Sequence, residues 1–267
     1  SRSGKNWLDR KLQRRLKRHQ VDAPKSNGPF DPDVVELGRN LFFDKELSGN
    51  RDIACSTCHH PEAMTGDALS LPAGVGGVGT IPNRRLGPGK EFVPRNSPEL
   101  FNRGLSDWET MFWDARVEES PHGSLITPAG QKLQKGLNGV LAAQAMFPVT
   151  SRAEMRGFKG DGNELSSIDD GDLHKMWSRI MDRLLKIPGY RNLFRDAYPN
   201  TKLSDLKYRD AANAIATFEK AAFTFLDSPF DRYLRGDKNA LTTKQKKGAA
   251  IFYGKGGCAS CHSGTLT

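Results

Sequence analysis

The sequence reads Cys-Ser-Thr-Cys-His at residues 55–59 and Cys-Ala-Ser-Cys-His at residues 258–262, and these two copies of C-x-x-C-H use all four cysteines. In this pattern the cysteines form thioethers with the vinyl groups of a haem, and the adjoining histidine donates its imidazole to the iron. We therefore predict two covalently bound c-type haems. Their attachment and ligand residues are Cys55, Cys58 and His59 for the first haem and Cys258, Cys261 and His262 for the second.

Two other interpretations of the cysteine pairs are a zinc site and two redox dithiols. Zinc ribbons usually separate their pairs by about 15–20 residues, whereas these pairs lie near opposite ends of the chain. Neither alternative explains a histidine after both pairs. The spacing favours covalent haem.

The chain has 267 residues and a formal net charge of +9, before any haem propionates are counted. This length allows one large core or two modest ones, and two distant haem motifs favour two. Much of the positive charge lies in the first twenty residues, where Leu8, Leu12 and Leu16 recur at helical spacing among basic side chains. We expect a basic amphipathic helix whose apolar stripe packs on the rest of the protein, in preference to one that contacts a membrane or an acidic partner.

The apolar runs are shorter than the about 18 residues that a membrane-spanning helix needs, so we predict no membrane span. Nucleic acid is not an expected partner, because aromatic residues do not interleave with the basic ones. Bacteria attach c-type haem outside the cytoplasm. We therefore expect a periplasmic protein whose signal segment was removed before Ser1.

Helix signals are clear and strand signals are sparse, which predicts a mostly α-helical fold. A first helix is expected over Asp31–Phe42, with an aspartate cap and a proline in its first turn. A second is expected over Leu206–Leu226, where a Ser-Pro pair ends the apolar periodicity. A third should begin at a Thr242 or Thr243 cap and run through Phe252 towards the second motif.

Two segments rich in glycine are predicted to lack regular structure. Residues 71–89 should form a loop across the distal face of the first haem, and the glycines of residues 157–171 indicate a boundary between halves. The predicted domains are a basic N-terminal segment at 1–26, a first c-haem domain at 27–163 and a second at 164–267.

Further motifs follow one another in order from about residue 37 to the end. They are LGRNLFFD at 37–44, RNSP with FN at 95–102, FWDAR at 112–116, a Q…P…EM segment at 144–155, and SPFD with YLRGD at 228–237. Together they resemble the bacterial di-haem cytochrome c peroxidase and MauG family. An ordered set of this kind is far more specific than any single motif.

The resemblance implies two cytochrome c-like domains, with a peroxide-reactive haem in the first and an electron-transferring haem in the second. It implies that Glu154 is the acid–base group above the first iron, with Gln144 beside it. A carboxyl in that place can take a proton from one peroxide oxygen and return it to the other. The resemblance also places Trp113 between the haems and a calcium ion at Asn96, and we assign Trp108 to the core.

The chain departs from many peroxidases of this family in the loop after the first motif. Those proteins carry a histidine there that caps the resting iron, but residues 64–92 contain none. His122, in a later insertion, is the one substitute we consider, and a lone histidine there is expected to face solvent. We therefore expect an open first haem, as in MauG-like members.

A second departure is that the sequence stops shortly after His262. The family continues with a segment that supplies a distal methionine or tyrosine to the second haem. A c-haem domain can hardly close its core directly after its attachment motif. We therefore expect the second domain to be incomplete in this chain.

Three functions fit these patterns. The first is reduction of hydrogen peroxide with electrons from a small cytochrome c or a cupredoxin. The second is MauG-like oxidation of a tryptophan or tyrosine in a partner protein. The third, a non-enzymatic electron carrier, needs no acid–base group, so Glu154 and Gln144 argue against it. The leading expectation is a peroxide-dependent di-haem oxidoreductase. The sequence leaves open whether the protein forms a homodimer.

Overall fold

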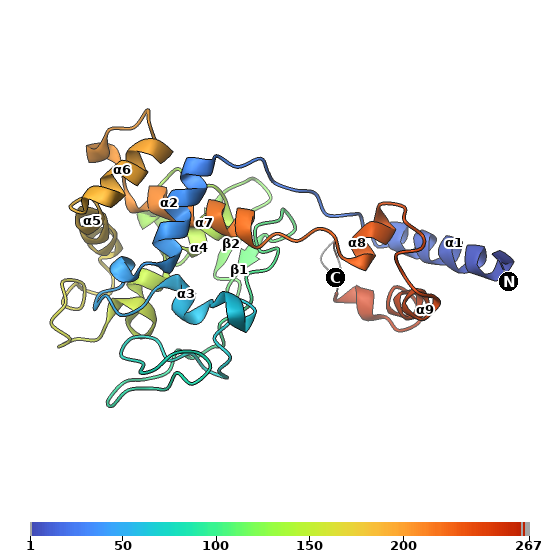
Figure 1. Cartoon of the computed structure of the whole chain (residues 1–267), viewed down its shortest axis with the longest axis horizontal. Helices are drawn as coiled ribbons and strands as arrows, with labels where there is room; N and C mark the ends of the chain where they lie inside the picture. Colours follow the sequence, from blue (N-terminus) through green and yellow to red (C-terminus); the bar gives the residue numbers. More distant parts are fainter. Residues whose placement is uncertain (1, 263, 265–267) are drawn as a thin grey trace. The chain divides into compact units, whose positions relative to one another are not determined.

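The computed structural model describes residues 2–262 and residue 264 (Figure 1). The described chain is mostly helical, as the sequence predicts, with three short strands. No helix in this part of the chain combines the length and the apolar character that crossing a membrane requires. The α-helices are α1 (Arg2–Arg18), α2 (Pro32–Phe43), α3 (Cys55–Cys58), α4 (Val140–Gln144), α5 (Leu173–Leu184), α6 (Pro188–Ala197), α7 (Tyr208–Ala222), α8 (Pro229–Leu234) and α9 (Thr243–Phe252).

The remaining elements are short. The strands are β1 (Thr110–Met111), β2 (Val117–Glu119) and β3 (Leu125–Ile126). The short 3-10 helices are η1 (Lys45–Leu47), η2 (Pro61–Ala63), η3 (Gly130–Lys132), η4 (Pro148–Thr150), η6 (Leu203–Asp205) and η7 (Cys258–Ser260). The element η5 (Arg152–Arg156) is a π-helix.

The chain forms two compact units. Unit 1 comprises Ser1–Asn27, Leu105–Asp107 and Thr224–Thr267, and unit 2 comprises Gly28–Gly104 and Trp108–Phe223. The glycine-rich segment at 157–171 lies inside unit 2, because α6 and α7 both pack on α2 and α5 packs on α7. These units describe which segments pack together. The assignment of one haem domain to 27–163 and another to 164–267 stays a prediction.

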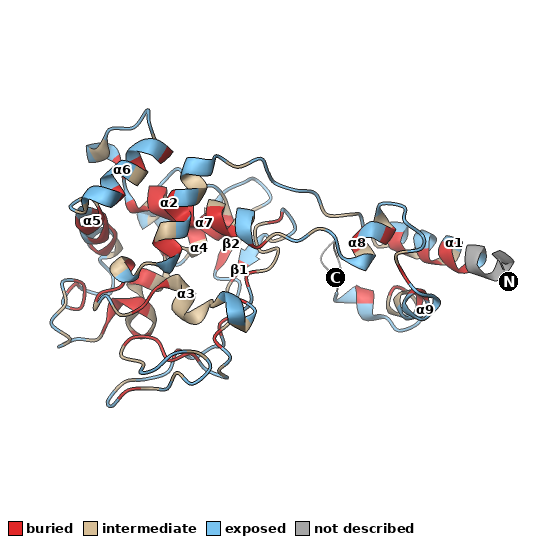
Figure 2. Cartoon of the chain, in the orientation of Figure 1, coloured by how far each residue is buried: buried red, intermediate tan, exposed pale blue. Residues whose placement is uncertain are grey.

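The centre of unit 2 is the contact between α2 and α7. Asp31 caps α2 as predicted, since its side chain accepts the backbone N–H of Asp33 at 2.9 Å. Leu37, Leu41 and Phe42 of α2 are buried in the main core of this unit, and Val34 and Val35 pack against it partly buried (Figure 2). Gly38 lies where α2 meets α7, and any Cβ there would overlap the carbonyl oxygen of Ala214. The glycine therefore permits a closer approach of the two helices than alanine would.

Helix α7 ends earlier than the apolar periodicity predicts. Its last residue is Ala222 rather than Leu226, and the N–H of Phe223 closes the helix on the carbonyl of Glu219. Phe223 turns into the core of unit 2, whereas Phe225 is 58% exposed. The prediction overshot because apolar residues continue at helical spacing into a segment that belongs to unit 1.

The three strands form one antiparallel sheet in the order β1-β2-β3. Met111 and Val117 are paired neighbours on β1 and β2, and both are buried against α4. The turn between β1 and β2 carries Trp113, and α4 ends at Gln144. Trp113 and Gln144, two of the predicted site residues, thus lie on elements that pack together in one small cluster.

Unit 1 is built around the contact between α1 and α9. Leu8, Leu12 and Leu16 are buried, which confirms the apolar stripe predicted for the basic helix. Asp9, on the same helix, pairs with Lys246 of α9 at 2.7 Å and accepts the Tyr233 hydroxyl at 2.9 Å. Helix α1 therefore packs with the helix that leads to the second C-x-x-C-H.

Candidate functional site

The first C-x-x-C-H motif forms one short helix, α3, followed by its histidine. The hydroxyl of Thr57 accepts the N–H of Ala54 at 2.9 Å, and the N–H of His59 bonds to the carbonyl of Cys55 at 2.9 Å. Cys55 and Cys58 are three residues apart on this turn, so they are neighbours on one helix face. The three residues predicted to attach and ligate the first haem are thus close together and partly buried.

His59 has its Nδ1 engaged by a backbone carbonyl. Its Nδ1 lies 3.0 Å from the carbonyl oxygen of Thr65. Burial lowers the pKa of this histidine, which favours the neutral imidazole that binds metals. A neutral ring that donates Nδ1–H to a carbonyl keeps its Nε2 lone pair for iron. The donor set of this motif therefore fits c-type haem.

The thiols of the first motif do not have the character of a redox pair. Burial raises the pKa of both Cys55 and Cys58 to about 12, whereas redox-active C-x-x-C thiols have lowered pKa values. The raised pKa values of these thiols disfavour the redox-dithiol interpretation.

Glu154 lies on the π-helix η5, between two backbone contacts to the segments that flank the first motif. The N–H of Gly49, before the motif, bonds to the carbonyl of Met155 at 2.7 Å, and the N–H of Val75, after it, bonds to the carbonyl of Ala153 at 3.0 Å. Single π-helical turns are frequent at functional sites. The position of Glu154 relative to the first motif is thus set by its two immediate neighbours.

The surroundings of Glu154 give its carboxyl an unusual proton affinity. Burial raises its pKa to about 7, against the opposing effects of the Arg116 charge and the Ser151 side chain. Burial raises the pKa of the Cys58 thiol most, the Asp67 charge raises it next, and the Glu154 charge raises it further. Glu154 therefore lies near the first motif. A carboxyl with a pKa near neutrality can both accept and return a proton.

Trp113 and Trp108 have different environments. Trp113 is 67% exposed, and the Arg95 guanidinium lies 4.2 Å from the centre of its ring. Trp108 packs against the cluster that contains Met111, with Arg103 3.9 Å above its ring. Trp108 therefore has the packing role that we expected, while the side chain of Trp113 is available at the surface of unit 2.

Gln144 and His122 complete the residues predicted around the first haem. Gln144 is partly buried at the end of α4, and no hydrogen bond joins its side chain to Glu154 among the described residues. His122 is exposed in the turn between β2 and β3, where a solvent-facing histidine was expected. The role proposed for Gln144 and the role proposed for Glu154 therefore each rest on the position of that residue alone.

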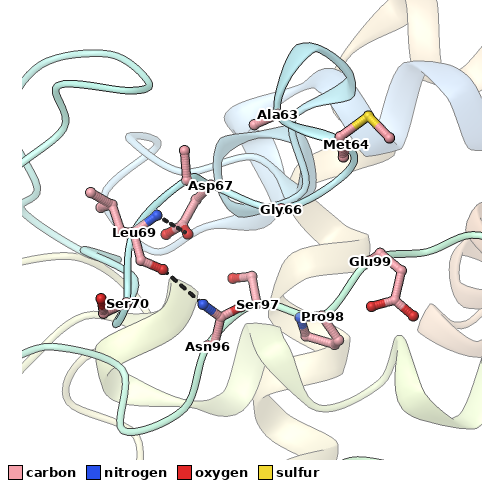
Figure 3. Close-up of a pocket in the computed structure, with 11 residues that line it drawn as sticks. Ala63, Met64, Gly66, Asp67, Leu69, Ser70, Asn96, Ser97, Pro98 and Glu99 are labelled. Carbon is pink, nitrogen blue, oxygen red and sulfur yellow. Dashed lines mark hydrogen bonds between the residues drawn. The ribbon is translucent and has the colours of Figure 1, made fainter.

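Asn96 lines a pocket of about 450 Å³ in unit 2 (Figure 3). Its Nδ2 donates to the carbonyl oxygen of Leu69 at 2.8 Å, and Oδ1 of Asp67 accepts the Leu69 N–H at 3.1 Å. The other oxygen of Asp67 is buried and has no hydrogen-bond partner among the described residues. Glu99 lines the same pocket. Oxygen donors of this kind fit a hard cation such as calcium.

The second C-x-x-C-H motif lies in unit 1, on η7 and the residues after it. The N–H of His262 bonds to the carbonyl of Cys258 at 2.9 Å, so the turn is closed as in the first motif. Ala259 is buried with Leu12 and Tyr253, whereas Cys258, Cys261 and His262 are exposed. The His262 ring lies 6.1 Å from that of Phe252 at the end of α9.

Several contributors to the site lay outside our sequence-based predictions. Gly49 and Val75 act through backbone N–H groups, which give no residue-specific signal. Thr65 acts through its carbonyl, and Asp67 was not singled out. A signal for Asp67 was its place nine residues after Cys58, where an acidic side chain follows a glycine in the loop.

Comparison with known proteins gives consistent results. Residues 32–239 match the family model described as di-haem cytochrome c peroxidase, and this match ends before the second C-x-x-C-H. The methylamine utilization protein MauG of Methylorubrum extorquens is 32% identical over 254 residues, which are 94% of this chain and 55% of that protein. The cytochrome c551 peroxidase of Pseudomonas aeruginosa is 30% identical over 236 residues, 88% of this chain and 52% of that protein. The chain spans about half the length of the curated relatives it matches.

A solved structure supports the same relationship. The crystal structure of a MauG-like protein associated with microbial copper homeostasis superposes with a TM-score of 0.56 at 26% sequence identity, covering 91% of this chain and 55% of the other. The family match covers more than half of this chain, and its limits enclose the first motif and Glu154. The chain therefore belongs to the di-haem cytochrome c peroxidase family.

Proposed function

We propose that this chain is part of a peroxide-dependent di-haem oxidoreductase with its peroxide site at the first motif. The observation that carries the proposal is the position of Glu154, whose neighbours Ala153 and Met155 bond to the segments on either side of that motif. A carrier of electrons has no use for a carboxyl with a pKa of about 7 beside its haem attachment site.

The residues of unit 2 have separate tasks in this proposal. Haem, when bound, supplies the redox-active iron at which the oxygen–oxygen bond of peroxide is cleaved. Cys55 and Cys58 would attach the haem, and His59 would ligate its iron through Nε2. The Glu154 carboxylate accepts a proton from one peroxide oxygen and donates it to the other, and Gln144 orients the substrate.

The second motif is proposed to attach a second haem through Cys258 and Cys261, with His262 as its ligand, in a second cytochrome c-like domain. This haem would exchange electrons with the first and with a partner. One calcium ion is proposed at Asn96, supported by the oxygen-rich pocket around it and the unpartnered oxygen of Asp67. A periplasmic location follows from where bacteria attach c-type haem.

Two modes of reaction use the same site. In the first, hydrogen peroxide is reduced with electrons from a small cytochrome c or cupredoxin. In the second, the oxidised haem pair removes electrons from a tryptophan or tyrosine of a partner protein, in MauG-like fashion. The loop at 64–92 has no histidine that could cap the first iron, and an open iron is compatible with both modes.

The proposal is tested with the full-length holoprotein, hydrogen peroxide and a reduced small cytochrome c. Because each peroxide takes up two electrons, the first mode predicts oxidation of about two cytochromes per peroxide consumed. In the second mode, peroxide consumption should oxidise aromatic residues of a protein substrate, detected by mass spectrometry. A holoprotein that leaves peroxide unconsumed with either kind of electron donor would support the carrier alternative instead.

Gly74→Ala should slow the peroxide reaction while leaving both haems attached. A Cβ at Gly74 would overlap the carbonyl oxygen of Ala153, so the contact between the Gly74 loop and the π-helix that carries Glu154 must open. A misplaced catalytic group can cost about 10²-fold in rate. The check is rapid-mixing spectroscopy of the variant with peroxide. Gly189→Ala is the control, because a Cβ at Gly189 meets open space, and an unchanged rate in Gly74→Ala would mean that this contact does not position Glu154.

Trp113→Phe should preserve the peroxide reaction at the first haem but prevent the oxidation from spreading to the second. Phenylalanine keeps much of the ring and removes the easily oxidised indole. The measurement follows both haems spectroscopically after one equivalent of peroxide. Trp108→Phe is the control, since that ring packs against a cluster of its own unit. Equal transfer in Trp113→Phe and the parent would show that this indole is no relay.

A further inference from the structure

We propose that Thr65 is a positioning residue for His59. Its carbonyl oxygen holds the Nδ1–H of the imidazole, and its hydroxyl holds that carbonyl in place. The inference rests on the proposed haem attachment at the first motif. It extends that proposal by naming the residue that controls the proximal ligand.

Every polar atom of Thr65 has a partner. Its N–H donates to the carbonyl of His60 at 2.9 Å, and its carbonyl lies 3.0 Å from Nδ1 of His59. Its hydroxyl donates to the carbonyl of Met64 at 2.7 Å and accepts the N–H of Leu100 at 2.7 Å. Thr65 is only 1% exposed. One side chain thus ties the loop after the haem motif to a segment 35 residues further along the chain.

The backbone of Thr65 is in a conformation that threonine seldom adopts. Its φ is 59°, and that of the preceding Met64 is 56°. A β-branched residue in the left-handed region is a true outlier, whereas glycine or asparagine would fit there easily. The two hydroxyl bonds offset this strain. The side chain, and not the ease of the turn, therefore accounts for threonine at this position.

The arrangement has a consequence for the iron. A hydrogen bond accepted from the distant nitrogen of a ligating histidine fixes the ring and raises the basicity of the ligand. A more basic imidazole stabilises the ferric state, so this bond should lower the reduction potential of the first haem. Pro98 presents a second carbonyl that acts on the same imidazole. The Leu100–Thr65 bond anchors the segment that carries Pro98 two residues away.

The test compares Thr65→Val and Thr65→Ser in the full-length holoprotein. Valine keeps the β-branch and loses both hydroxyl bonds, while serine keeps the hydroxyl. Two quantities are measured: the iron–histidine stretching frequency of the reduced protein, by resonance Raman, and the midpoint potential of the first haem in every variant. We expect Thr65→Val to lower the frequency and raise the potential, with about a tenfold change in the equilibrium constant for reduction. Thr65→Ser should resemble the parent.

The matched control is Thr217→Val, which also removes one hydroxyl bond to the backbone in unit 2, but within α7, at the carbonyl of Asn213. It should leave both quantities unchanged. If Thr65→Val fails to fold, Thr65→Gly removes the hydroxyl without backbone strain and should show the same shifts.

The outcomes separate this inference from the proposed function. Haem content is measured first by the pyridine haemochrome spectrum, and a parent without haem at the first motif would refute the proposed function. Haem present in all variants, with frequency and potential unchanged in Thr65→Val, would overturn the role of Thr65 and leave Pro98 as the acceptor. Equal shifts in Thr217→Val and Thr65→Val would reduce the effect to general loosening of unit 2.

Discussion

Glu154→Gln is expected to slow the reaction of the diferric protein with peroxide by about 10²–10⁴-fold, the usual effect of losing a general acid–base group. Glutamine preserves the shape of the side chain and cannot accept the proton. The flanking backbone bonds at Ala153 and Met155 do not involve the carboxyl, so the π-helix should keep its position. Both haems should stay attached. The rate is measured by rapid mixing with excess peroxide.

The pH dependence of the same reaction identifies the group. The carboxylate is the form that accepts a proton, and burial raises the pKa of Glu154 to about 7. The rate in the parent should therefore rise as the pH increases through about 7 and level off above it. In Glu154→Gln this step should disappear.

Glu36→Gln provides a control for the same chemical change at a surface position. Glu36 is exposed on α2 and bonds to Arg39 of its own helix. Its substitution should leave the rate and its pH profile unaltered. A Glu154→Gln variant that reacts at the parent rate with an unchanged profile would remove Glu154 from the mechanism.

Replacing the cysteines of one motif at a time should produce two different losses. Cys55→Ala combined with Cys58→Ala should remove one covalent haem and abolish the peroxide reaction, because no other haem lies near Glu154 in the proposed arrangement. Thioethers survive denaturation whereas axial bonds do not. The remaining haem is therefore counted on the denatured protein by its absorption and by mass spectrometry.

Cys258→Ala combined with Cys261→Ala is the matched variant at the second motif. It should also retain one covalent haem, but peroxide should still react at the first site while electrons from an external donor no longer arrive. Loss of the peroxide reaction in this variant alone would mean that peroxide reacts at the second motif and not at the first. Haem that acid–acetone extracts from the parent would contradict covalent attachment altogether.

The parts of the fold that were predictable are those with a local signal. Asp31 and Thr242 mark the starts of α2 and α9 because their side chains can accept backbone N–H groups there. The stripe of Leu8, Leu12 and Leu16 predicts one buried helix face, because an apolar stripe packs against an apolar surface whichever element supplies that surface. It does not reveal that the partner is α9, more than 200 residues away, since that choice depends on tertiary packing.

Features without a local signal were missed. The apolar spacing past Phe223 continues although the helix ends, because the chain leaves unit 2 there. The glycines at 157–171 lie inside unit 2, where helices on both sides of them pack together, and the haem-domain boundary expected there stays a prediction.

The candidate site divides in the same way. The haem motifs are visible in the residues, and Glu154 was singled out by its place in an ordered series of motifs, while its role stays a prediction. The hydrogen bonds that Gly49 and Val75 donate to the π-helix use backbone N–H groups, and Thr65 contacts His59 through its backbone carbonyl. Such groups give no signal of their own in the sequence. They become apparent only in three dimensions.

Electron paramagnetic resonance of the diferric full-length holoprotein, before and after one equivalent of hydrogen peroxide, tests the central claim most directly. The absence of histidine from residues 64–92 predicts a high-spin signal from the first haem that peroxide removes without prior reduction. Only low-spin signals, with no response to peroxide until the protein is reduced, would contradict an open peroxide site at the first motif and implicate a capping ligand such as His122.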